Sequence, residues 1–100
     1  MCLTGRKVKA DEALQIGLVN EVVSADELEK RTVAIASHLA GLPGRALALT
    51  KRLLNDSLER SLTEQLEAEA YAQDTAGKTK DHFEGVTAFL EKRSPNFIGE

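Results

Sequence analysis

The stretch that decides the fold lies near the end of the chain, where residues 81–97 read DHFEGVTAFLEKRSPNF. Phe83, Val86 and Leu90 recur at helical spacing, so the pattern predicts a last helix with one apolar face. Three of the four aromatic residues of the chain lie in this stretch. A helix that concentrates scarce aromatic area is expected to dock on another surface.

The end of this helix carries two cations and a proline. We expect Lys92 and Arg93 in the last turn, where positive charge complements the helix dipole. Ser94 and Pro95 are expected to stop the helix, because the residue before proline is pushed out of the α region. A basic helix end followed by an aromatic tail is typical of a simple stop signal or of a ligand clamp. Composition alone favours the stop signal.

Working outward from this helix, the sequence predicts four more. Thr79 is a plausible N-cap of the last helix, and Ser61 opens a capping box for a helix that ends near residue 76. A leucine-rich helix is expected over residues 44–59, and Ser24 opens a second capping box for a helix that ends near residue 41. A first helix is expected over residues 10–16, and residues 18–23 are expected to form a short strand or an extended connector.

The leucines of the third predicted helix cover an arc wider than one stripe, so we expect burial on two sides. On the next helix, Leu62, Leu66 and Ala70 are expected to face inward. The outward face then carries three acidic residues, which we interpret as a solvated helix face rather than as a catalytic carboxylate cluster: Glu64, Glu67 and Glu69.

The bulk properties exclude several classes of function. One hundred residues with a formal net charge of −3 argue against a nucleic-acid or anionic-membrane partner. No apolar run approaches the ~20 residues of a membrane span. The only cysteine, Cys2, is compatible with a reducing cytoplasm, which is the predicted location. His38 and His82 are separated from each other and from Cys2, so we expect no metal site.

Several short motifs together resemble one family. The pattern EGVxAFLEKRxPxF at residues 84–97 resembles the C-terminal signature of the crotonase superfamily, the enoyl-CoA hydratase/isomerase family. LTGR at residues 3–6, ADEA at 10–13 and GLVNEVV at 17–23 are similar to family elements in the same order, and TKRLLN at 50–55 is similar to another. The resemblance covers essentially the whole chain, but only about the last two-fifths of a complete family member.

The resemblance implies a mainly α fold, namely the helical C-terminal trimerisation domain of the crotonase fold with one short extended segment near residues 18–23. We expect a single domain over residues 1–100. The oxyanion hole and the acidic catalytic residues of the family belong to an N-terminal spiral core that lies upstream. No residue of this sequence is therefore assigned a catalytic role, and we expect the chain alone to be inactive.

The resemblance also implies a cofactor-binding role for two residues. Phe89 and Lys92 match family positions that help to bind the nucleotide end of coenzyme A, often one held by a neighbouring subunit. An aromatic face can cover adenine or the pantetheine arm, and an ammonium group can meet a phosphate. The alternative is that Phe89 is a core residue and Lys92 a surface cation. Tyr71 lies on a helix that lines the acyl pocket in related enzymes, although packing is favoured for it, as it is for Phe83 and Phe97.

The implied function of the complete protein is hydration or double-bond isomerisation of an acyl-CoA thioester of fatty acid metabolism through a thioester enolate. No metal or covalently bound cofactor is expected, and the implied assembly is a homo-oligomer, a trimer or hexamer. Residues 76–79, AGKT, also look like those of phenylacetate-pathway ring-acyl-CoA isomerases. The rival from another class is a non-enzymatic helical oligomerisation module. Both interpretations predict self-association, because the leucine arc leaves apolar surface exposed in a monomer.

Overall fold

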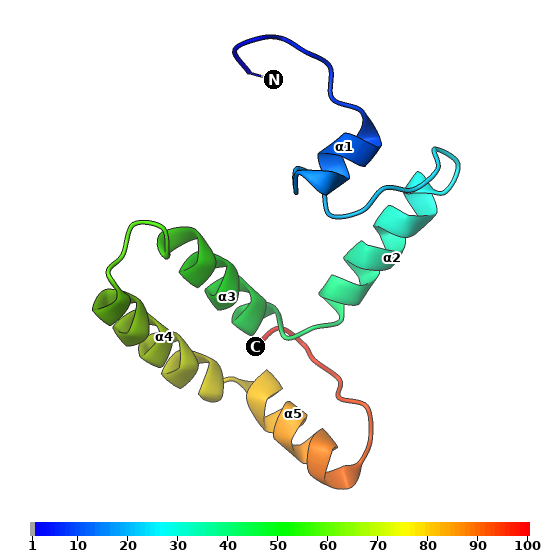
Figure 1. Cartoon of the computed structure of the whole chain (residues 1–100). Coiled ribbons are helices and arrows are strands. Elements are labelled where there is room, and N and C mark those ends of the chain that lie inside the picture. The colour runs from blue at the N-terminus through cyan, green and yellow to red at the C-terminus, as the bar shows by residue number, and fades with distance from the viewer. Residues whose placement is uncertain (1) are drawn as a thin grey trace. The chain divides into compact units, whose positions relative to one another are not determined.

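The computed structural model describes residues 2–100, and these form helices without any strand (Figure 1). The predicted mainly α fold is therefore confirmed. The contacts divide the chain into a leading unit that ends at Ile35 and a second unit, Ala36–Glu100. This division into contact units does not test the single domain expected over residues 1–100, which stays a prediction. The helices are α1 (Ala10–Gln15), α2 (Leu28–Ala40), α3 (Gly44–Asp56), α4 (Leu62–Gly77) and α5 (Lys80–Glu91).

In the leading unit, α1 ends where the sequence predicts. Gly17 has φ +71°, the left-handed conformation that favours glycine, and the Leu18 N–H donates to the Ala13 carbonyl at 2.8 Å. Residues 18–23 then form an irregular connector rather than a strand. Of the two predicted alternatives for this segment, the connector is the correct one. Glu21 on the connector pairs with Arg31 of α2 at 2.7 Å.

The start of α2 differs from the prediction. The Ser24 hydroxyl donates to the Glu27 carboxylate at 2.8 Å, and the Glu27 N–H donates to the Ser24 carbonyl at 3.1 Å. These contacts close a turn, and the helix begins only at Leu28. The predicted capping box is wrong because the Glu27 N–H bonds to the Ser24 carbonyl instead of to the Ser24 hydroxyl.

In the second unit, α3 and α4 form an antiparallel hairpin, and α4 contacts α5 (Figure 1). The capping box that opens α4 is confirmed: the Glu64 N–H donates to the Ser61 hydroxyl at 3.4 Å, and the Ser61 N–H donates to the Glu64 carboxylate at 2.8 Å. The predicted end of α3 at residue 59 is wrong. The helix stops at Asp56, and the Ser57 hydroxyl donates to the Leu54 carbonyl at 2.7 Å.

The described residues bury very little apolar surface. The buried apolar side chains are alanines, namely Ala13, Ala72 and Ala88. Leu54 is 67% exposed, and Leu62, Leu66 and Ala70 are exposed as well. The leucine arc thus leaves apolar surface exposed, as expected for a monomer, and its burial on two sides stays a prediction; the expected inward face of α4 is wrong within this chain. A helical hairpin gives each helix one close neighbour, so the remaining apolar faces stay uncovered.

None of the described helices combines the length and the apolar character that a bilayer-spanning helix needs.

Candidate ligand-binding site at the last helix

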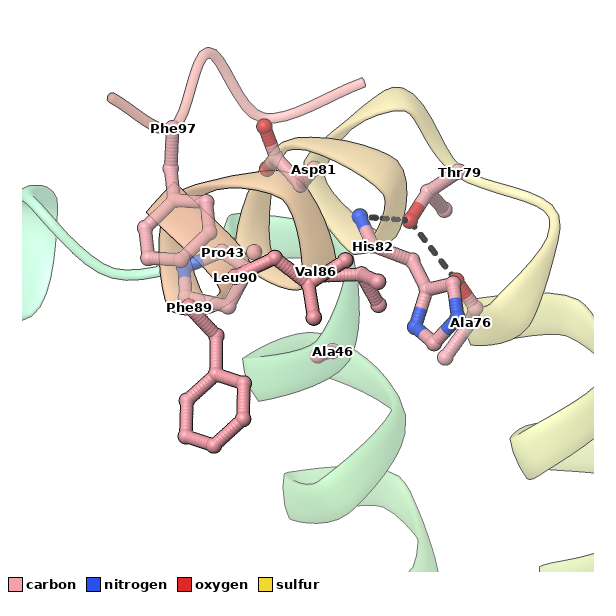
Figure 2. Close-up of a pocket in the computed structure, with 11 residues that line it drawn as sticks. Pro43, Ala46, Ala76, Thr79, Asp81, His82, Val86, Phe89, Leu90 and Phe97 are labelled. Carbon is pink, nitrogen blue, oxygen red and sulfur yellow. Dashed lines mark hydrogen bonds between the residues drawn. The ribbon is translucent and has the colours of Figure 1, made fainter. Parts of the chain in front are cut away.

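The first turn of α5 is fixed by a side-chain cap. The Thr79 hydroxyl accepts the His82 N–H at 3.1 Å and donates to the Ala76 carbonyl at 2.7 Å, as the dashed lines of Figure 2 show. The predicted N-cap is confirmed. This cap satisfies one of the N–H groups that a helix start leaves without an intrahelical partner.

The last turn of α5 ends earlier than predicted. Lys92 has φ 55° and ψ 39°, which is the left-handed conformation. Its N–H donates to the Phe89 carbonyl at 3.3 Å, and the Arg93 N–H donates to the Ala88 carbonyl at 3.0 Å. This pair of hydrogen bonds is a Schellman motif, with lysine at the position where glycine is usual. The prediction that Lys92 and Arg93 lie in the last turn is wrong, and the helix stops before it reaches Pro95.

Arg93 explains why the chain turns here. Its guanidinium group reaches back along α5 and makes a two-pronged contact with Glu84, at 2.6 and 2.9 Å. The Asn96 N–H donates to the same carboxylate at 2.7 Å. The Arg93 contact, and then the Asn96 N–H, lower the pKa of Glu84 from 4.5 to about 2, while Glu84 raises the pKa of Arg93. The segment that follows α5 is thus tied to the helix by an ionised carboxylate.

An apolar groove lies along α5, between this helix, the start of α3 and the C-terminal tail, and it encloses about 410 Å³ (Figure 2). We call it the α5 groove. Figure 2 shows the Phe97 side chain reaching from the tail toward α5. The Phe97 ring lies 3.6 Å from the place that a Cβ on Gly85 would occupy, so the ring rests on the helix at its one glycine. The lining residues are Pro43, Ala46, Ala76, Thr79, Asp81, His82, Gly85, Val86, Phe89, Leu90 and Phe97.

Both residues predicted to bind coenzyme A lie at the C-terminal end of α5. Phe89 is 82% exposed and borders the α5 groove, and its ring stands clear of the other labelled side chains in Figure 2. Phe89 is therefore not a core residue of the described chain, and both interpretations of it stay predictions. Lys92 is exposed at the left-handed turn. An open aromatic ring and a nearby ammonium group offer stacking and a phosphate contact, and the binding role itself stays a prediction.

The other candidate residues lie elsewhere or have other contacts. Tyr71 is exposed and lines a cavity of about 90 Å³ between α3 and α4, and Phe83 is exposed beside the His82 ring, so the packing expected for both stays a prediction. Phe97, by contrast, packs on α5 as predicted. The described residues include no group of three or more His, Cys, Asp or Glu side chains arranged to hold a metal ion.

Sequence reasoning missed the main role of Asp81. We expect this residue to favour the helix start through its charge, but its side chain is 1% exposed and accepts the N–H groups of Ile98 and Gly99 at 2.7 and 2.9 Å. One signal was available: Asp81 and Glu84 are three residues apart, so they share a face of α5. The return of the tail past that face is a long-range feature that periodicity does not report.

Comparison with known proteins places the chain in one family. The sequence model described as enoyl-CoA hydratase/isomerase matches residues 1–100. A Rhodobacter capsulatus protein named "Probable enoyl-CoA hydratase" is 41% identical over 99% of this chain and 38% of its own length. The 1,2-epoxyphenylacetyl-CoA isomerase of Escherichia coli is 37% identical over 100% of this chain and 38% of its own length.

The structure agrees with the sequence comparison. The crystal structure of an enoyl-CoA hydratase from Geobacillus kaustophilus matches with a TM-score of 0.91 and 36% identity, over 98% of this chain and 37% of that one. The chain thus spans somewhat more than a third of the length of the proteins that it matches. From its sequence signature, its helices and these matches, the chain belongs to the enoyl-CoA hydratase/isomerase family.

Proposed function

We propose that this chain is the C-terminal helical part of an enzyme that hydrates or isomerises acyl-CoA thioesters through a thioester enolate. In this proposal the chain serves assembly and covers part of the coenzyme A site, and the catalytic groups lie in the rest of the protein. The acyl-CoA is the substrate, no metal or bound cofactor takes part, and the enzyme works in the cytoplasm.

The observation that carries this proposal is the uncovered apolar stripe of α5, which leads to Phe89 and Lys92. Val86, Phe89 and Leu90 are all exposed on a helix whose two ends are firmly fixed. A rigid helix that presents an aromatic ring and then a cation suits a ligand with a flat base and a phosphate, as in the nucleotide end of coenzyme A. The names of the relatives support the same substrate class, since both curated relatives above are named for reactions of CoA thioesters.

The assembly role rests on the same kind of observation. Leucines on α3 and α4 are exposed, and so are the aromatic rings of α5. Soluble proteins rarely leave apolar patches of this extent open, so these faces suit contacts with other parts of the protein or with neighbouring subunits. We propose a homo-oligomer, a trimer or a hexamer.

Two alternatives have a specific observation in their favour. A ring-acyl-CoA isomerase of the phenylacetate type is supported by the similarity to the Escherichia coli epoxyphenylacetyl-CoA isomerase over the full chain. A non-enzymatic helical oligomerisation module is supported by the described residues themselves, because their apolar faces are exposed and no catalytic residue is assigned among them.

Calorimetric titration with coenzyme A, on an assembly that contains this chain and the catalytic part of the enzyme, tests the proposal. We expect Lys92→Glu to weaken binding by about tenfold or more, because it replaces an attraction for phosphate by a repulsion. Lys51→Glu is the matched control, since Lys51 is an exposed cation on α3 and not at the C-terminal end of α5. Equal affinity of the wild type and Lys92→Glu would remove Lys92 from the site. No affinity in any of the three proteins would favour the oligomerisation module.

Activity assays then separate the two enzyme classes. A hydratase consumes the conjugated double bond of an enoyl-CoA and takes up water, so the mass of the product rises by one water. An isomerase gives a product of unchanged mass.

A further inference from the structure

The C-terminal tail, residues 94–100, runs back along α5 toward the start of that helix (Figure 1). It leaves the helix at the left-handed turn of Lys92. Its second-last residue, Gly99, has φ +84°. Gly99 also approaches the start of α3, since its Cα lies 3.9 Å from the place of a Cβ on Gly44. The tail therefore runs from the end of α5 back to the beginning of the same helix and to the beginning of α3.

Two carboxylates of α5 hold the tail by accepting hydrogen bonds from backbone N–H groups of the tail. Asp81 accepts the N–H groups of Ile98 and Gly99, and its own N–H donates to the Glu100 carbonyl at 2.9 Å. Glu84 accepts the N–H of Asn96 and the guanidinium group of Arg93. Hydrogen bonds to ionised acceptors are stronger than neutral ones, and the Asp81 contacts are buried, where such bonds are also less screened by water.

An ion pair between the Lys80 ammonium group and the Glu100 carboxylate also holds the end of the tail, and few other contacts do. Ile98 is 61% exposed, and Ser94, Pro95 and Asn96 are exposed too. The apolar anchor of the tail is the half-buried Phe97 ring on Gly85, which is also a wall of the α5 groove. A segment with few buried apolar contacts and a small number of strong polar ones opens as a unit when those polar contacts are lost.

We propose that two sets of hydrogen bonds, which we call latches, hold the tail in place. The Asp81 latch keeps Phe97 over the α5 groove, and the Glu84 latch fixes the turn that carries Lys92. With the Asp81 latch closed, the groove has a wall on the tail side. With this latch open, Phe97 leaves Gly85 and that side of the groove becomes an open helix face. Asp81 and Glu84 are thus positioning residues, and this inference does not depend on which ligand the groove binds.

The latches predict an alternating pattern of amide protection. The N–H groups of Asn96, Ile98 and Gly99 have carboxylate acceptors, whereas the Phe97 N–H has no acceptor among the described residues. Residue-resolved hydrogen exchange on the full wild-type chain is expected to show slow exchange at the amides of Asn96, Ile98 and Gly99. Exchange at the Phe97 amide is expected to be fast. Fast exchange at all four amides would overturn the proposal without the need for any variant.

Substitutions then separate the latches. Asp81→Asn is expected to speed exchange at Ile98 and Gly99 by about tenfold or more, because one of the two N–H groups then faces an amide donor instead of an acceptor. Glu84→Gln is expected to act mainly on Asn96. Asp74→Asn is the matched control, since this exposed carboxylate pairs with Lys78 on the neighbouring turn and does not contact the tail. Unchanged exchange at Ile98 and Gly99 in Asp81→Asn, with the helices intact by circular dichroism, would overturn the proposal.

Discussion

Replacing Lys92 by glycine separates two properties that meet in this residue, a left-handed helix end and an exposed cation. Lys92 has φ 55°, and its N–H closes one of the two hydrogen bonds of the Schellman motif. Lys92→Gly keeps this turn and removes both the Cβ and the ammonium group. Lys92→Ala removes the ammonium group and keeps the Cβ, so the pair of variants differs only in backbone freedom at this position.

The expected difference in stability follows from two opposing terms. A residue with a Cβ in the left-handed region costs about 1–2 kcal/mol relative to the right-handed helix, and glycine avoids this cost. Glycine also lowers the free energy of unfolding by about 0.4–1 kcal/mol, because it gives the unfolded chain greater freedom. We therefore expect Lys92→Gly to be more stable than Lys92→Ala by about 0.5–1 kcal/mol.

Urea unfolding of the full chain, followed by circular dichroism, measures this difference. Lys92→Gly and Lys92→Ala with equal unfolding midpoints would refute the argument, because the left-handed turn would then be absent in solution. The second readout is the coenzyme A affinity of the same variants, measured in an assembly with the catalytic part of the enzyme. If the ammonium group meets a phosphate, both variants bind about tenfold more weakly than the wild type and equally to each other.

Three further predictions test other parts of the fold. Gly85→Ala should stabilise the chain by about 0.5–1 kcal/mol in urea unfolding, because Gly85 is helical and the new methyl group would meet the Phe97 ring at an ordinary contact distance of 3.6 Å; a loss of stability would contradict the packing of Phe97. Ser61→Ala should cost about 1 kcal/mol through loss of the α4 cap, whereas Ser24→Ala, at a serine that caps no helix, should cost clearly less. The pKa of Glu84 is lowered in the folded chain. The contribution of its carboxylate to stability is therefore complete above pH 4.5 and is lost as the pH falls toward about 2. Amide exchange at Asn96 should rise over that interval after correction for the intrinsic rate, and Glu84→Gln should remove the pH dependence.

Local chemistry made most of the helices predictable. Gly17 ends α1, Ser61 opens α4 and Thr79 opens α5, because each of these signals acts on atoms within a few residues of itself. The same reasoning failed at Ser24, where the Glu27 N–H bonds to the serine carbonyl instead of to its hydroxyl group. It also failed at the end of α5, where the long side chain of Arg93 returns to Glu84 across nine residues.

The candidate site was less predictable than the helices. The positions of Phe89 and Lys92 at one helix end could be read from the sequence, but their exposure could not, because periodicity marks a face as apolar without showing what covers it. For the same reason, leucines expected in a core, such as Leu62 and Leu66, are exposed in this chain. The contact between Asp81 and the tail joins residues 17 and 18 positions apart, and no local signal specifies such a pairing.

We propose that this chain is an assembling part of a larger functional unit, with its apolar helix faces covered by other protein surface. Light scattering on the purified full chain measures its assembly, with Leu54→Asp as the variant and Asn55→Asp as a neighbour that gains the same charge. We expect the wild type and Asn55→Asp to have a mass that is a multiple of the chain mass. Leu54→Asp should fall to a lower mass with its helices intact, because a charge on a covered apolar face is costly to bury without a partner. A wild-type monomer whose mass Leu54→Asp leaves unchanged would contradict the account.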